Sequence, residues 1–118
     1  MYITSFEQLA PLAPFQNGHW NQEHLYQYLV HSCNKNLSSE IDAYFAPFCS
    51  DRALAELLFS FLLDDDYDGS DSQMGAAYYL RRMDREVLRS CEALLRKAQE
   101  NGVFWKRPFP NDEHLQWL

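Results

Sequence analysis

The chain is poor in the residues that build β-sheets and long loops. Valine and isoleucine are scarce among its 118 residues, and no stretch rich in them alternates apolar with polar side chains. Such alternation is the signature of strands, so β-sandwiches and barrels are excluded. With only four glycines and five prolines, a loop-rich scaffold is also excluded. We therefore predict an all-α fold, formed as a single domain over residues 1–118.

The chain also lacks the cysteine patterns of disulfide frameworks and metal clips. Its three cysteines, Cys33, Cys49 and Cys91, are far apart, and each falls within a helical pattern. We interpret them as small core residues, because free cysteine is among the most buried residue types. The sequence contains no apolar run of signal-peptide or membrane-spanning length. We expect a soluble cytoplasmic protein.

Basic side chains are scarce in the first two thirds of the chain. Residues 1–80 hold 11 acidic groups but only Lys35 and Arg52 on the basic side, a balance of −9. Residues 81–118 hold eight basic and six acidic groups, a balance of +2, and the whole chain carries −7. Nucleic-acid binding depends on cationic side chains that neutralise phosphates, so we expect no direct nucleic-acid binding. The same charge attracts a basic protein partner.

Apolar and aromatic side chains, in contrast, are abundant and recur at helical spacing. They make up 47% and 15% of the chain, enough for a substantial core. We predict one compact bundle of about five to six short antiparallel helices. The expected segments are a capped turn at 6–10, an irregular connection at 11–20, and helices near 22–34, 38–48, 51–63, 72–83 and 84–101.

Polar residues at the expected helix starts predict the caps. Asn21 is placed to cap one helix, and Ser39 with Asp42 three residues later resembles a capping box. Ser50 is expected to cap the next helix, with Asp51 in its first turn. The residues that follow predict a central core helix that is apolar on nearly all sides. Its repeat is formed by Leu54, Leu57, Leu58, Phe61 and Leu62.

The C-terminal segment is rich in aromatic residues and is predicted to fold back over the bundle. We expect Phe104 and Phe109 to pack in the core. Trp105 and Trp117 serve either as core residues or as interface residues, since tryptophan is common in both settings. If this tail is an interface, the protein is a helical adaptor.

An acidic loop, residues 64–71, follows the central helix and is the most distinctive stretch of the chain. It carries five carboxylates in eight residues. Buried charges each need a partner, so these side chains must project into water from the end of the buried helix. We predict that the loop binds a partner, with Glu56 or Asp51 nearby. The predicted contact residues are Asp64, Asp65, Asp66, Tyr67, Asp68, Asp71 and Glu56.

The same loop matches parts of two metal-binding patterns. Asp64, Asp66, Asp68 and Gly69 match the first half of an EF-hand loop, but Gly75 stands where a bidentate glutamate is required. The run also resembles the aspartate-rich motif of prenyl-diphosphate enzymes, without their second motif. The histidines show no metal-ligand spacing. We expect no metal and no cofactor, and a metal-dependent enzyme acting on a phosphorylated small molecule remains the alternative.

Four arginines form a basic patch near this loop in the sequence. The patch consists of Arg81, Arg82, Arg85 and Arg89, and the stretch Arg85–Arg89, with Glu86 and Glu92, is interpreted as ordinary exposed helix charges. The alternative is that some of them hold the loop carboxylates in place.

In its general character, the chain resembles the bacterial immunity proteins of contact-dependent growth inhibition systems. It is short, acidic and all-α, with no catalytic set, and the Asp64–Asp71 run marks the likeness locally. The resemblance implies an inhibitor, not an enzyme, that forms a one-to-one complex with the toxin domain of a large secreted protein. Many such toxins are nucleases with basic clefts, which complement clustered carboxylates.

Overall fold

The computed structural model describes residues 3–32, 34–64 and 71–100 of the chain. The mostly helical fold is confirmed, but these residues form seven α-helices instead of five to six. The helices are α1 (Phe6–Leu9), α2 (Gln22–His31), α3 (Ser38–Phe45), α4 (Arg52–Leu62), α5 (Asp71–Leu80), α6 (Arg85–Ser90) and α7 (Glu92–Gln99). Two 3-10 turns, η1 (Ala10–Leu12) and η2 (Ala46–Phe48), extend α1 and α3.

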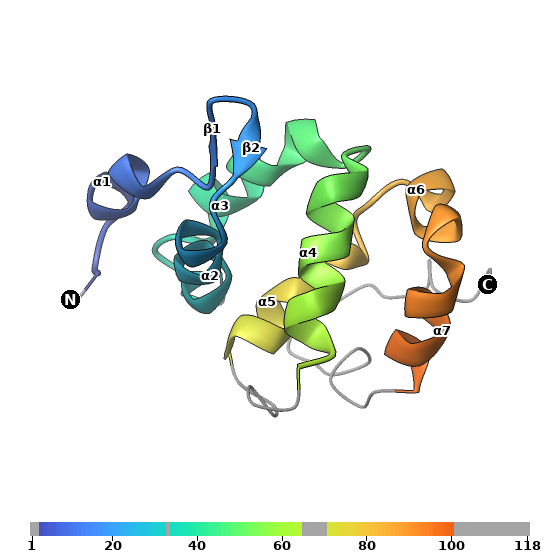
Figure 1. The fold of residues 1–118 in the computed structure, drawn as a ribbon. Coiled ribbons are helices and arrows are strands. Elements are labelled where there is room, and N and C mark those ends of the chain that lie inside the picture. Colours follow the sequence, from blue (N-terminus) through green and yellow to red (C-terminus); the bar gives the residue numbers. More distant parts are fainter. Residues whose placement is uncertain (1–2, 33, 65–70, 101–118) are drawn as a thin grey trace.

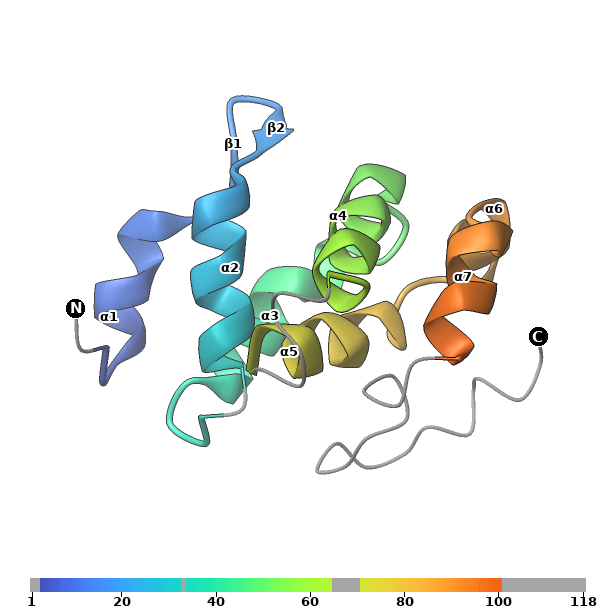
Figure 2. The same ribbon diagram turned by 60° about the horizontal axis from the view of Figure 1, so that its bottom comes forward.

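Helix α5 lies at the centre and packs against both α2 and α4. Figures 1 and 2 show α1 outside α2, and α6 with α7 on the far side of α4. The close packing of α5 depends on small residues, because Gly75, Ala76 and Ala77 are all buried. A Cβ atom at Gly75 would meet the carbonyl oxygen of Leu29 in α2. The absence of a side chain at this position therefore allows the two helices to approach each other.

Helix α4 buries one broad face and leaves the other in water. Leu54, Ala55, Leu58, Phe59 and Leu62 are almost fully buried. The opposite side exposes three residues at helical spacing, and Leu57 between them is half-buried. The central core helix is thus confirmed, but the prediction that it is apolar on nearly all sides is wrong. These three exposed residues are Ala53, Glu56 and Ser60, and Arg52 at the start of the helix is exposed as well.

The segment predicted to be an irregular connection contains a small β-hairpin. Strand β1 (Phe15–Gln16) pairs antiparallel with β2 (His19–Trp20), and Phe15 lies opposite Trp20. The turn residues Asn17 and Gly18 have φ angles of 54° and 81°. A two-residue turn with both φ values positive matches the twist of paired strands, and Asn-Gly is its preferred sequence. The prediction of an irregular connection is therefore wrong, because Asn17 and Gly18 adopt the conformation that joins two paired strands.

The predicted caps are confirmed at α1, where Ser5 and Gln8 form a capping box, and at α2, and they are corrected at α3 and α4. The Asn21 side chain accepts a hydrogen bond of 3.0 Å from the His24 amide, as expected. At α4 the cap is Asp51, which accepts from the Leu54 amide at 3.1 Å, and not Ser50. Asp42 takes no part in capping α3, because its carboxylate binds two tyrosines of α5. The expected second helix ends at His31, three residues early.

The last predicted helix is broken in two at Cys91. Its backbone (φ −112°, ψ 39°) leaves the helical region between α6 and α7. The adjacent Ser90 hydroxyl donates to the Val87 carbonyl at 2.6 Å, a local bond that competes with helix continuation. The helix before it, α5, ends at Leu80, although it was predicted to reach about Met83.

The cysteine prediction holds in part. Cys91 is buried and Cys49 is half-buried, and both are free thiols. Cys33 and the aromatic tail, with Phe104, Trp105, Phe109 and Trp117, lie outside the described residues. No helix in the described ranges has the length and apolar character needed to cross a bilayer.

Candidate functional site

The predicted contact residues fall on and around α4 and α5. Asp64 follows α4 and is half-buried, Asp71 is the exposed first residue of α5, and Glu56 is exposed on α4. The loop between Asp64 and Asp71 connects two helices that pack against each other. The remaining contact residues lie outside the described ranges: Asp65, Asp66, Tyr67 and Asp68.

The base of the acidic loop is held by a buried glutamine. Gln73, only 2% exposed, donates through Nε2 to the Leu62 carbonyl at 2.9 Å and to the Asp64 carbonyl at 3.0 Å. The first acceptor is at the end of α4, where carbonyls have no helical partner. One side chain of α5 thereby binds the backbone on both sides of Leu63, the residue that follows α4. Sequence reasoning missed this contact, since a glutamine in a helix gives no sign of what it binds.

A groove of about 600 Å³ lies between the hairpin and the exposed side of α4. One wall is formed by the hairpin and the other by the start and outer face of α4. It was not predicted, because the hairpin itself was missed. The groove is lined by Phe15, Gly18, His19, Trp20, Asp51, Ala53, Glu56, Leu57 and Ser60.

The aromatic wall of the groove is fixed by packing and by one hydrogen bond. The Trp20 ring centroid lies 4.9 Å from that of Phe15 and 4.9 Å from that of Phe48. The Trp20 indole Nε1 donates to Asp51 Oδ2 at 3.2 Å, while Oδ1 of the same carboxylate caps α4. Asp51 therefore sets both the start of α4 and the orientation of the indole ring.

The acidic wall is contributed by Glu56. Its side chain is 54% exposed, and Oε1 lies 3.5 Å from the Nε atom of Arg52. Such exposed pairs on a helix contribute only about 0.3–0.5 kcal/mol. The groove thus joins carboxylates to a partly exposed tryptophan, a combination suited to cationic side chains.

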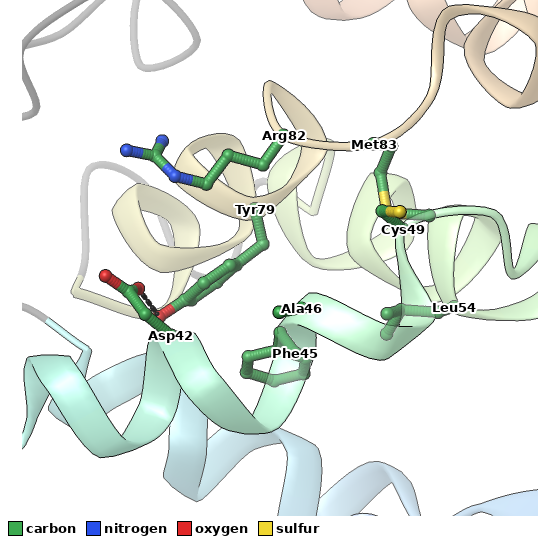
Figure 3. A pocket seen from close by; sticks show the side chains of 8 residues that line it. All are labelled: Asp42, Phe45, Ala46, Cys49, Leu54, Tyr79, Arg82 and Met83. Atoms are coloured by element: carbon green, nitrogen blue, oxygen red, sulfur yellow. Dashed lines mark hydrogen bonds between the residues drawn. The ribbon is translucent and has the colours of Figure 1, made fainter.

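A second cavity, of about 380 Å³, lies where α3, α4 and α5 meet (Figure 3). Asp42 at its edge accepts from the Tyr79 hydroxyl at 2.7 Å and from the Tyr78 hydroxyl at 3.2 Å. Burial, followed by the Asp42 carboxylate, raises the pKa of Tyr79 far above its ordinary value. The Arg82 guanidinium lies 3.6 Å above the Tyr78 ring. This cluster ties α3 to α5, and we interpret it as structural.

The thiol in this cavity belongs to Cys49, beside Met83 (Figure 3). Burial, and then the nearby Asp84 carboxylate, raise the pKa of the Cys49 thiol. The thiolate is the nucleophilic form, so the environment suppresses this residue's reactivity.

The predicted basic patch is confirmed only in part. Arg85 and Arg89 are exposed, as predicted, and Arg82 is exposed too, but Arg81 is only 4% exposed and so does not belong to an exposed patch. Within the described ranges, no three histidine, cysteine, aspartate or glutamate residues are grouped as metal ligands. Gly75, which stands at the last ligand position of the EF-hand pattern, is buried in α5 against α2.

The chain matches no family model, no curated protein and no solved structure.

Proposed function

We propose that this protein is an immunity-type inhibitor, which binds a basic toxin domain and catalyses no reaction itself. The proposed partner is the toxin domain, a nuclease, of a large secreted protein, and the complex forms in the cytoplasm. The binding surface is the acidic loop together with the exposed side of α4, including Asp64, Asp71 and Glu56.

The observation that carries the proposal is the hydrogen bonding of α5 to the end of α4, at the base of the acidic loop. Asp64 and Asp71 lie at the facing ends of packed helices, and Gln73 bonds to the backbone there. A rigid base lowers the entropy lost when charged side chains become ordered on binding. The charge distribution supports the same conclusion, because residues 1–80 carry a balance of −9.

The chemistry of the partner follows from that charge. A nuclease cleft that binds phosphates presents arginine and lysine, and arginine pairs with carboxylates in bidentate geometry. Opposite charges accelerate encounter, which matters for an inhibitor that must act before the toxin does. Pairs that are desolvated in the complex then slow its dissociation.

The test uses the full chain and the toxin domain encoded in the neighbouring reading frame. Association is measured by biolayer interferometry between about 50 and 300 mM salt, and protection by growth of cells that express the toxin domain. The variant Asp64→Asn, Asp68→Asn, Asp71→Asn is expected to lose about tenfold or more in affinity, chiefly through charge. The association rate is expected to fall as salt rises, because exposed charges are screened.

The matched control removes three charges elsewhere. Glu7, Glu23 and Glu40 are exposed on α1, α2 and α3, and their replacement by glutamine changes net charge equally. We expect this control to retain most of the affinity and full protection. An equal loss in the two variants, or a loss in neither, contradicts the loop as the binding surface.

A further inference from the structure

The groove between the β-hairpin and α4 combines an oriented tryptophan with an exposed carboxylate. We infer that this groove is a receptor for an arginine side chain of the basic partner, with Glu56 pairing the guanidinium and Trp20 packing against it. The inference rests on the proposed function for the source of the arginine and for Glu56 as part of the binding surface. It adds Trp20 and the hairpin side of the groove to that surface.

The aromatic half of the receptor is prepared before binding. Trp20 lines the groove and is half-buried, and Phe15 and Phe48 pack against its ring. Its indole nitrogen is engaged with Asp51, so Trp20 offers a ligand in the groove its ring and not its N–H donor. A guanidinium over a tryptophan ring is attracted by the negative face of the ring. Tryptophan and arginine are also the residue types that dominate binding hot spots.

The acidic half is supplied by Glu56, with Asp51 deeper at the same wall. Oε1 of Glu56 already lies 3.5 Å from the Nε atom of the Arg52 guanidinium. Arg52 is not one of the residues that line the groove. That pair is exposed on both sides and is therefore weak, so it yields to a guanidinium that gains an aromatic contact as well. The groove volume of about 600 Å³ falls within the usual range for ligand sites, about 300–1,000 Å³.

The choice of arginine as the occupant follows from charge. Asp51 and Glu56 are the carboxylates of the lining, and no lysine or arginine is among the lining residues. An anionic group would be repelled by both carboxylates, and a purely apolar group would leave Glu56 without a new partner. A planar cation satisfies the ring and the carboxylate together.

The test needs no partner protein. The full chain, labelled with nitrogen-15, is titrated with the peptide acetyl-Gly-Arg-Gly-amide and with the same peptide containing citrulline, an uncharged isostere of arginine. We expect the arginine peptide to shift the Trp20 indole resonance and the amides of Ala53, Glu56 and Ser60 in a saturable manner. The Trp20 resonance is assigned from the Trp20→Phe spectrum. Citrulline is expected to bind at least about threefold more weakly, from the loss of charge.

The chain provides a closely matched control for Glu56. Glu92 on α7 is 58% exposed and also forms an ion pair with an arginine four residues away, Arg96. Glu56→Gln is expected to weaken arginine binding at least about threefold, and Glu92→Gln to leave it unchanged. Equal binding of citrulline, equal effects of the two variants, or shifts without saturation overturn the inference. Because the acidic loop is untouched, any of these outcomes leaves the proposed function to be judged by its own test.

Discussion

Replacing Gly75 by alanine tests the close packing of α2 and α5. In an exposed helix, alanine is more favourable than glycine by about 0.5–1 kcal/mol. At Gly75, however, the added Cβ would meet the Leu29 carbonyl oxygen and lie 2.7 Å from the Ser32 hydroxyl oxygen. These two atoms already form a hydrogen bond of 2.7 Å, so neither moves without loss.

The expected result is a net loss of stability. Overpacking of this kind costs about 1–3 kcal/mol, and a disturbed hydrogen bond about 0.5–1.5 kcal/mol more. After subtraction of the propensity gain, the free energy of unfolding falls by about 0.5–4 kcal/mol. For a domain of this size that lowers Tm by about 4 °C per kcal/mol. Urea denaturation followed by far-UV circular dichroism measures the free energy, and a thermal scan measures Tm.

The control compares the same two residue types at an exposed helical position. Ala53→Gly on the outer face of α4 is expected to destabilise by about 0.5–1 kcal/mol, so alanine is preferred there. At position 75 the preference is reversed. If Gly75→Ala instead leaves the urea midpoint unchanged or raises it, the helices are not in contact at this point and the packing argument fails.

Three further changes test other contacts. Asp42→Asn leaves one tyrosine hydroxyl of the α3–α5 cluster without an acceptor oxygen on residue 42. We expect the free energy of unfolding, measured by urea titration, to fall by about 1–3 kcal/mol. Gln73→Leu leaves the Leu62 and Asp64 carbonyls without this donor. We expect a similar fall in the free energy of unfolding and faster hydrogen exchange at the end of α4. Unchanged exchange there would contradict the anchoring of the loop. At high pH the buried tyrosines should destabilise the fold. Burial raises the pKa of Tyr28 from 10.0 to about 12, so the unfolded chain loses that proton first. The contribution of Tyr28 to stability is therefore complete below pH 10 and declines between about pH 10 and 12. A urea midpoint that is constant across this window would refute the prediction.

Much of the helical structure could be read from local patterns. The repeat from Leu54 to Leu62 identified α4, and Asn21 identified the start of α2. The hairpin could also have been predicted from the sequence, since Asn17 and Gly18 form the dipeptide that favours its turn. These features depend on residues within a few positions of each other, and the physical preferences involved act over that range.

The contacts that shape the candidate site are of a different kind. Asp42 was expected to cap its own helix, yet it binds tyrosines 36 and 37 residues away. The indole of Trp20 binds Asp51 across 31 residues, and Glu56 enters the groove only because the hairpin packs beside α4. The roles of Asp65, Asp66, Tyr67 and Asp68 stay predictions.

The order and approximate positions of most helices, and the concentration of negative charge after α4, follow from local sequence patterns. Helical periodicity and charge are local properties of the sequence, so they do not depend on how the helices pack. Which helix faces carry those charges, and which carboxylates are already used inside the molecule, depends on how the helices pack. At Gly75 the close approach of the helices requires the absence of a methyl group. This requirement exists only because α2 and α5 pack against each other at that point.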